Sequence, residues 1–333
     1  MRLPNFDYHA PLSLSEALGW LSEHKTEGIR ILAGGTDLLV DLRSKIIPDS
    51  HRPRCQQHRA GGRSASVDQY PEMICLMSIT QIDELRGISL AGRRLHIGAL
   101  TTIAELERSP VVRELATGLY DGAAQLGSPL VRNRGTYGGN ICNARPAADT
   151  AIPTLALGGK LVLASPRGER IVDHSEFVTG PGTTILAADE ILKEIMFDIP
   201  DRLFGSAYIK LANRKALEIS MVGAAAAVVF DLTEACVSRD RRQLTVESAR
   251  IALGAVAPKP LLASDAGEYL AGKLFSQENI AEAAQLAARQ AKPITDHRGS
   301  AQYRRMMVET LVRRALTICR ERALSGITEK AST

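Results

Sequence analysis

The spacing of apolar residues follows a helical period in some segments of the chain and a strand period in others, which predicts a mixed α and β protein. The stretch Ser13-Leu14-Ser15-Glu16 has the form of a capping box and opens an apolar-periodic helix. A strand-like run, IRILAGG, then ends on paired glycines, and TDLLVDLR follows with helical or turn-like spacing. Further on, strands are predicted in MICLMSI, EILKEIMFDIP and SAYIKLANRK, and hairpins in ISLAGRRLHIGAL and GKLVLASPRGERIV. The segment TIAELERSPVVRELA is predicted to be helical up to a break at Pro110.

Two changes in composition and in the apolar pattern divide the chain. Residues 48–71 are polar and rich in Arg, Ser and Gly, with almost no apolar period, so we expect a polar surface insertion there. From about Ile219 an Ala-rich apolar segment begins, followed by strands near Leu244 and Ile251 and then by helices. The pattern therefore predicts a first domain over residues 1–218, a second over 219–325 and a tail over 326–333.

Composition narrows the class of protein. A length of 333 residues with 45% hydrophobic content suits two or three domains. The net charge of +4 comes without a long basic run and with only 4% aromatic residues, which gives no support for nucleic-acid binding. The longest apolar run, MVGAAAAVVF, is shorter than the roughly 20 residues of a membrane span. The absence of an apolar leader at the N-terminus and five scattered cysteines without a C-x-x-C pair predict a cytoplasmic location.

Two glycine pairs, Gly34-Gly35 and Gly138-Gly139, carry the clearest candidate chemistry. Each stands beside a threonine hydroxyl and a polar side chain, and bare backbone N–H groups can cradle a phosphate. Either pair alone is also compatible with an ordinary turn, but two such loops suggest a ligand with two phosphates, such as a dinucleotide. The patterns G-x-G-x-x-G and G-x-x-x-x-G-K-[ST] are absent, so neither a Rossmann fingerprint nor a P-loop is predicted.

Other chemistries find little support in the sequence. Zinc sites usually show two tight ligand pairs, and the chain has one, Cys55-x-x-His58, among the candidates His51, Cys55, His58 and Cys75. Cys142 stands alone, whereas an iron–sulfur cluster needs four thiolates, so a small buried hydrophobe is the simpler interpretation. The neighbours Asp173 and His174 are interpreted as a chance pair in a surface loop, since no G-x-S-x-G elbow accompanies them. No metal site and no catalytic nucleophile are predicted.

Three segments occur together and in order: LAGGTDLLVDLR, TYGGNICNARPAADTAIP and DHRGSAQYRRMMVETLVRRAL. With them the chain resembles the FAD-binding medium subunit of the molybdenum hydroxylases, a family that includes carbon monoxide dehydrogenase, xanthine dehydrogenase, aldehyde oxidase and 4-hydroxybenzoyl-CoA reductase. The resemblance covers nearly the whole chain except residues 48–71. It implies an α+β fold, with a two-lobed FAD domain of the vanillyl-alcohol-oxidase type over 1–218. A smaller α+β domain, like the C-terminal domain of the CO dehydrogenase flavoprotein, is implied over 219–325.

The resemblance also implies the cofactor site. Both glycine loops would hold the diphosphate of FAD, and a lysine at the flavin edge would favour an anionic reduced flavin. The residues implied in FAD binding are Ala33, Gly34, Gly35, Thr36, Asp37, Leu38, Thr136, Tyr137, Gly138, Gly139, Asn140, Asp149, Leu192 and Lys210. Two positions depart from the family: the Tyr137 ring packs either on the flavin or in the core, and no role is predicted for Arg145.

The implied function is electron transfer rather than substrate chemistry. One non-covalent FAD would exchange electrons between [2Fe–2S] clusters of a small subunit and an external partner, while a large subunit carries molybdopterin and the substrate. A dimer of such heterotrimers is expected. A self-sufficient flavin oxidase is the alternative, although the glycine motifs lack the histidine of a covalent flavin link. A scaffold without FAD is a third reading, against which the intact glycines argue. The four-cysteine cluster loop of the 4-hydroxybenzoyl-CoA reductase should be absent, because no insertion follows the second glycine motif.

Overall fold

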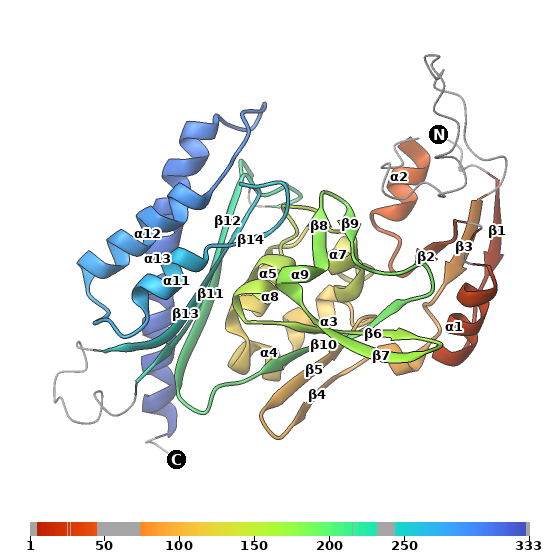
Figure 1. Ribbon diagram of the computed structural model, residues 1–333, viewed down its shortest axis with the longest axis horizontal. Helices are drawn as coiled ribbons and strands as arrows, with labels where there is room; N and C mark the ends of the chain where they lie inside the picture. Colours follow the sequence, from red (N-terminus) through yellow and green to blue (C-terminus); the bar gives the residue numbers. More distant parts are fainter. Residues whose placement is uncertain are drawn as a thin grey trace.

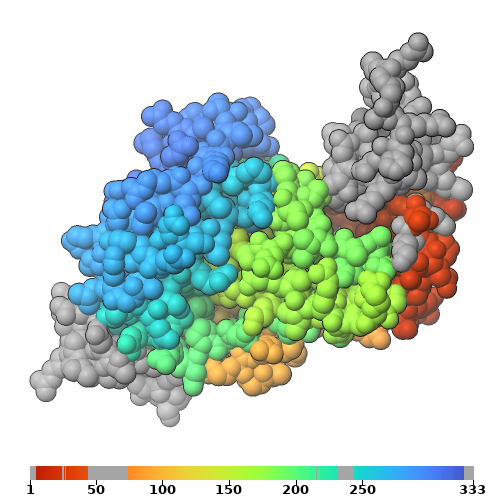
Figure 2. Space-filling view, viewed as in Figure 1, coloured from red at the N-terminus to blue at the C-terminus, as the bar shows by residue number. Residues whose placement is uncertain are grey.

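The computed structural model describes residues 5–24, 26, 28–44, 74–214, 216–231 and 244–330. The predicted insertion over 48–71, with Cys55, lies outside these residues. The molecule is elongated, with the N-terminal elements at one end, the C-terminal elements at the other and a central lobe between them (Figures 1 and 2). Within the described residues, no helix combines the length and the apolar character that a membrane crossing requires.

The N-terminal lobe is a small parallel sheet with strand order β1-β3-β2 and two helices. The side chain of Ser13 accepts a hydrogen bond from the Glu16 N–H at 3.2 Å, which caps the first helix as the sequence predicts. Ala17 and Leu21 of that helix are buried in a cluster with Met77 from the sheet. The elements are β1 (Phe6–His9), α1 (Leu14–Glu23), β2 (Arg30–Leu32), α2 (Leu38–Ser44) and β3 (Ile74–Ser78).

The central lobe is built on an antiparallel sheet with strand order β4-β5-β10-β6-β7. Short helices pack on it around a core that includes Ile97, Leu161 and Ile195. The sheet strands are β4 (Ile88–Ala91), β5 (Arg94–Gly98), β6 (Lys160–Ser165), β7 (Gly168–Asp173) and β10 (Ile191–Asp198), with a small ribbon of β8 (Val178–Gly180) and β9 (Thr183–Thr184). The helices are η3 (Asp83–Leu85), α3 (Ile103–Arg108), α4 (Pro110–Leu115), α5 (Thr117–Gln125), α6 (Pro129–Arg132), α7 (Tyr137–Cys142), α8 (Ala151–Ala156) and α9 (His174–Phe177).

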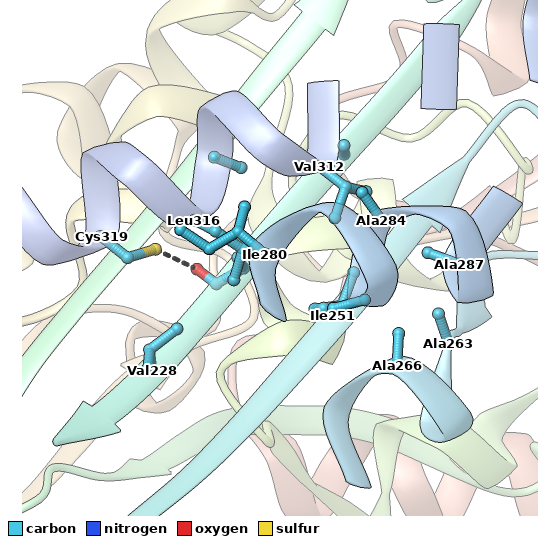
Figure 3. Packing of buried hydrophobic residues seen from close by; sticks show 14 of the residues in the cluster. Val228, Ile251, Ala263, Ala266, Ile280, Ala284, Ala287, Val312, Leu316 and Cys319 are labelled. Carbon is cyan, nitrogen blue, oxygen red and sulfur yellow. Dashed lines mark hydrogen bonds between the residues drawn. The ribbon is translucent and has the colours of Figure 1, made fainter. Parts of the chain in front are cut away.

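The C-terminal part is a four-stranded antiparallel sheet covered on one face by three helices. In Figure 3, Val312, Leu316 and Cys319 of the last helix lie over the sheet beside Ile280, and the Cys319 thiol donates to the Ala226 carbonyl at 3.3 Å. The elements are β11 (Leu203–Leu211), β12 (Val222–Phe230), β13 (Val246–Gly254), β14 (Leu261–Leu262), α11 (Ser264–Leu270), α12 (Gln277–Gln290) and α13 (Ala301–Lys330).

The apolar run MVGAAAAVVF contains the whole of β12, and both faces of this strand are buried. Ala224 and Ala226 point to the core under the C-terminal helices, whereas Ala225 and Ala227 belong to a cluster with α8 of the central lobe. This alternation follows the two-residue period of a strand. Small side chains on both faces let the sheet lie between helices of two different units, so the strand joins the C-terminal part to the central lobe.

Candidate cofactor site

The two glycine loops lie against each other, although about a hundred residues separate them in the chain. A Cβ atom added to Gly34 would strike the carbonyl oxygen of Arg134 and would lie 3.0 Å from the Gly135 Cα. On the other side of this contact, a Cβ on Gly135 would lie 3.6 Å from the Thr36 hydroxyl. The close approach of two backbones therefore requires glycine at position 34.

The first loop presents a run of backbone donors. The N–H groups of residues 34–38 donate to no acceptor in the described part of the chain. Gly35 has a φ of 73°, and its carbonyl accepts from the Leu39 N–H at 3.1 Å as α2 begins. Successive unpaired N–H groups in a loop form a nest that favours an anion. This loop has the chemistry that a diphosphate requires.

The second glycine pair lies in the first turn of α7 rather than in an open loop. The Thr136 hydroxyl caps this helix by accepting from the Gly139 N–H at 3.1 Å. The Tyr137 and Gly138 N–H groups donate to the carbonyls of Thr101 and Ala99, both at 2.8 Å. These three N–H groups at the start of α7 are thus already satisfied within the protein.

The two glycines of this pair have different neighbours. A Cβ on Gly138 would lie 2.6 Å from the Ala99 Cβ, so the protein itself, and not a ligand, explains the glycine there. A Cβ on Gly139 would meet the Thr136 hydroxyl and otherwise open space. The Ala99 side chain thus accounts for the glycine at position 138, whereas the space beside Gly139 is open among the described residues. A diphosphate against this pair stays a prediction.

Asn140 and Arg145 tie the second motif to its surroundings. The Asn140 side-chain oxygen accepts from the Thr150 hydroxyl at 2.6 Å, and its amide N–H₂ has no partner in the described residues. The Arg145 guanidinium lies 3.2 Å from the Asp41 carboxylate of α2. Burial and the nearby Asp41 carboxylate raise the pKa of Asp37, which Arg145 opposes. Arg145 thus links the second motif to the helix that follows the first loop.

Asp149 and Lys210 form a buried ion pair across the boundary between the central lobe and the C-terminal sheet. The Lys210 ammonium donates to the Asp149 carboxylate at 2.6 Å, and each side chain is 8% exposed. The Tyr208 hydroxyl donates to the other carboxylate oxygen at 2.8 Å. Burial raises the pKa of Asp149, while Lys210 and Tyr208 oppose that shift. Next to the pair lies a hollow of about 280 Å³ lined by Gln125, Lys210, Leu211, Ala212, Asn213, Arg214, Ala216 and Glu218.

Two family models match this chain in succession. The FAD binding domain in molybdopterin dehydrogenase matches residues 60–200, and the CO dehydrogenase flavoprotein C-terminal domain matches residues 207–318. The medium chain of carbon monoxide dehydrogenase from Hydrogenophaga pseudoflava is 32% identical over 94% of this chain and 96% of its own length. The chain belongs to the FAD-binding medium subunits of the molybdenum hydroxylases.

Other relatives agree with this assignment. The nicotinate dehydrogenase FAD-subunit of Eubacterium barkeri is 32% identical over 84% of this chain and 83% of its own length. A solved structure of carbon monoxide dehydrogenase from Hydrogenophaga pseudoflava superimposes with a TM-score of 0.81 at 32% identity, covering 97% of this chain and 99% of that one. The predicted fold class and family are therefore confirmed.

The domain boundary depends on β11. This strand pairs along its whole length with β12, from Leu203 opposite Phe230 to Leu211 opposite Val222. The C-terminal family model begins at residue 207, inside the same strand. Since a sheet is one structural unit, we propose that the boundary of the medium subunit lies between β10 and β11, before the predicted position at 218.

Two of the predicted site residues lie in the core of the central lobe. The Tyr137 side chain is fully buried, and its hydroxyl lies 2.6 Å from the Thr154 hydroxyl. The ring therefore packs in the core, one of the two placements expected for it. Burial raises the Tyr137 pKa well above its usual range. Leu192 on β10 is 4% exposed, and its contact with the cofactor stays a prediction. Cys142 is partly buried beside the same core, where desolvation raises its pKa to about 12.

Sequence reasoning missed residues that act through tertiary contacts. Tyr208 stands two positions before Lys210 on β11, so both point to the same face of the strand, and that spacing was a usable signal. Asp41 and Thr150 had no comparable signal.

His174, expected in a surface loop, is 2% exposed at the start of α9, which the Asp173 side chain caps. The candidates His51, Cys55 and His58 lie outside the described residues, and the residues that are described contain no cluster of potential metal ligands.

Proposed function

We propose that this medium subunit binds one FAD non-covalently, with the diphosphate against the N–H groups of residues 34–38 and the open side of Gly139. The observation that carries the proposal is the run of backbone N–H groups in the first loop that have no acceptor among the described residues, in a loop that lies in contact with the second motif. FAD supplies an electron carrier that accepts or donates one or two electrons. The chain's own residues bind it, orient it and set the charge around it.

Lys210 and Asp149 are the proposed charged groups at the flavin. Their ion pair lies beside the hollow that Gln125 and Arg214 also line. The ammonium donates to the Asp149 carboxylate and to the Gln125 carbonyl, which keep it in a fixed position, and a fixed cation stabilises negative charge that develops nearby. The Asn140 amide adds a neutral donor near the second motif.

The partners follow from the family. The medium subunit works with a large subunit that carries molybdopterin and a small subunit that carries [2Fe–2S] clusters. Electrons pass between those clusters, the FAD and an external acceptor or donor. We propose that the complex is a dimer of such heterotrimers in the cytoplasm.

Reconstitution tests this function. The purified chain loaded with FAD should pass electrons between artificial donors and dyes, and it should not oxidise or reduce an aldehyde, a purine or an aromatic thioester. Addition of the small and large subunits should make flavin reduction depend on substrate. Turnover of an organic substrate by the chain alone at roughly 1 per second or faster would instead identify a self-sufficient oxidase.

A further inference from the structure

The third sequence motif, DHRGSAQYRR, has no part in the functions described so far, yet it contains a buried cation. Arg304 on α13 is 4% exposed. Its guanidinium donates to the Asp296 carboxylate at 2.5 Å and to the Ala255 carbonyl at 3.0 Å. Asp296 also accepts from the Arg298 N–H at 2.8 Å, and this bond, followed by Arg304, lowers the Asp296 pKa to about 2. The carboxylate therefore fixes the guanidinium in one position.

Ala255 lies in a turn that requires support. It has a φ of 60°, a conformation that a residue with a side chain rarely adopts without outside contacts. Arg304 supports the turn at its carbonyl. On the other side, the Ala255 N–H donates to the Pro146 carbonyl of the central lobe at 2.7 Å. A Cβ on the preceding Gly254 would strike the Ile152 side chain and lie 3.2 Å from the Pro146 oxygen, so the turn is pressed against the central lobe.

Pro146 belongs to the segment Arg145–Asp149, which is held at three places. Arg145 pairs with Asp41 of the N-terminal lobe, Pro146 accepts from Ala255, and Asp149 binds Lys210 and Tyr208 of β11. The segment also leads out of the second glycine motif. A shift of its middle would move the Asp149 carboxylate and, with it, the Lys210 ammonium.

We propose that Arg304 is a positioning residue for the cofactor. It holds the turn at Ala255, the turn holds Pro146, and the segment Arg145–Asp149 is thereby fixed at the FAD site. The contact of Arg304 with the Ala255 turn, which we call the clasp, thus joins the third motif of the C-terminal domain to the segment Arg145–Asp149 of the central lobe. This role rests on the proposed function, because it assumes that FAD contacts this segment.

The experiment compares two Arg→Met variants of the full chain. Arg304→Met removes the clasp. Arg250→Met is the matched control: Arg250 on β13 donates to the Leu155 carbonyl of the central lobe at 3.2 Å and so also crosses the boundary, but away from the segment. Two quantities are measured: amide hydrogen exchange of peptides over residues 144–150 in the FAD-free chain, and the FAD dissociation constant from flavin fluorescence.

We expect Arg304→Met to speed exchange in residues 144–150 and to raise the FAD dissociation constant about tenfold or more, the size expected when a hydrogen bond from a charged group is lost. Arg250→Met should leave both close to wild type, and Arg304→Lys should recover part of the affinity. If Arg304→Met does not fold, Asp296→Asn, which frees the guanidinium, should produce the same two changes more weakly.

Unchanged exchange over residues 144–150 together with an unchanged dissociation constant in Arg304→Met would overturn the clasp. So would equal loss of affinity in Arg304→Met and Arg250→Met, because the effect would then be one of domain packing in general. Failure of the wild-type chain to bind FAD would contradict the proposed function instead. In that case the exchange measurement still decides whether Arg304 fixes the segment.

Discussion

At the scale of single residues, Gly34 is where the two halves of the proposed site meet. A methyl group at this position would strike the Arg134 carbonyl, and backbone cannot move aside as a flexible side chain can. We therefore expect Gly34→Ala to separate the first loop from the second motif and to raise the FAD dissociation constant by about tenfold or more. Titration with FAD, followed by flavin fluorescence, measures the change.

Gly19→Ala is the control for this substitution. Gly19 lies inside α1, and apart from the backbone of that helix no atom of the described residues lies within 4 Å of an added Cβ. Alanine should therefore leave FAD affinity unchanged and stabilise the helix by about 1 kcal/mol. Equal FAD affinity in Gly34→Ala and wild type would mean that the contact between the loops does not shape the site.

His174 makes the stability of the protein depend on pH. The ring is buried without a partner for either nitrogen among the described residues, and burial lowers its pKa to about 4. In the unfolded chain the pKa is about 6.5, so the unfolded state takes up the proton first. Stability is therefore lost as the pH falls from about 6.5 to about 4, and the loss amounts to about 2 kcal/mol at pH 5.

Replacement of His174 by leucine should remove this dependence. Urea unfolding at pH 5 and pH 8 measures the difference for wild type, for His174→Leu and for His297→Leu, whose histidine is exposed. The acid-induced loss should shrink in the first variant and persist in the second. A loss of the same size in His174→Leu would show that other groups cause it.

The sequence allowed the glycine pairs to be recognised as special, but it did not reveal the reason for each glycine. Gly138 is required by Ala99 and Gly34 by Arg134, and both contacts join segments that are distant in the chain. Arg145 appeared without a role because its partner Asp41 lies on another lobe. Residue types thus indicated where the site is, whereas the partners depend on tertiary structure.

At the scale of elements, the buried pair of Lys210 on β11 and Asp149 before α8 joins two units. Lys210→Met would leave the carboxylate buried with Tyr208 as its remaining side-chain donor among the described residues, and breaking a buried pair from one side costs about 3–5 kcal/mol. The double variant Lys210→Met, Asp149→Asn should recover most of that loss, because no charge is then left buried. Denaturant unfolding of the FAD-free chain, followed by circular dichroism, measures both.

An exposed pair provides the comparison. Arg289 and Glu282 on α12 lie 2.8 Å apart with side chains 59% and 41% exposed, and Arg289→Met should cost less than about 1 kcal/mol. If Lys210→Met cost no more than Arg289→Met, the Asp149 carboxylate would be free to take up a proton or to reach solvent, and its place in the site would need revision.

Element types followed from the sequence where one period dominated. The capped helix α1 and the strands with alternating burial were predicted from their patterns. The strand β12 appeared only as an apolar segment, because burial on both faces removes the alternation. The turn of helix at α7 was missed because two glycines weaken helical propensity, while the Thr136 cap that favours the helix was interpreted as a ligand group.

At the scale of the whole molecule, the family and the overall architecture were accessible from the sequence because three specific motifs occur together and in order. The boundary proposed between β10 and β11 rests on the pairing of β11 with β12, for which the change of composition near residue 219 gives no signal. The clasp at Arg304 belongs to this scale as well, because it connects the end of the sequence to the centre of the molecule.

The assembly gives a prediction at this scale. Co-expression with the small and large subunits should yield a particle whose native mass corresponds to two copies of each subunit. Native mass spectrometry measures the composition directly. A single heterotrimer at all concentrations would contradict the dimer, and a medium subunit that stays separate from the others would contradict the shared complex.

We propose that this chain holds one FAD without a covalent bond. The most direct test is to precipitate the purified chain with acid after loading with FAD and removal of the excess, and then to measure the flavin in the supernatant and in the pellet. About one FAD per chain is expected in the supernatant and none in the pellet, with the yield sharply reduced in Gly34→Ala. A colourless protein that takes up no FAD, or flavin that stays in the pellet, would contradict it.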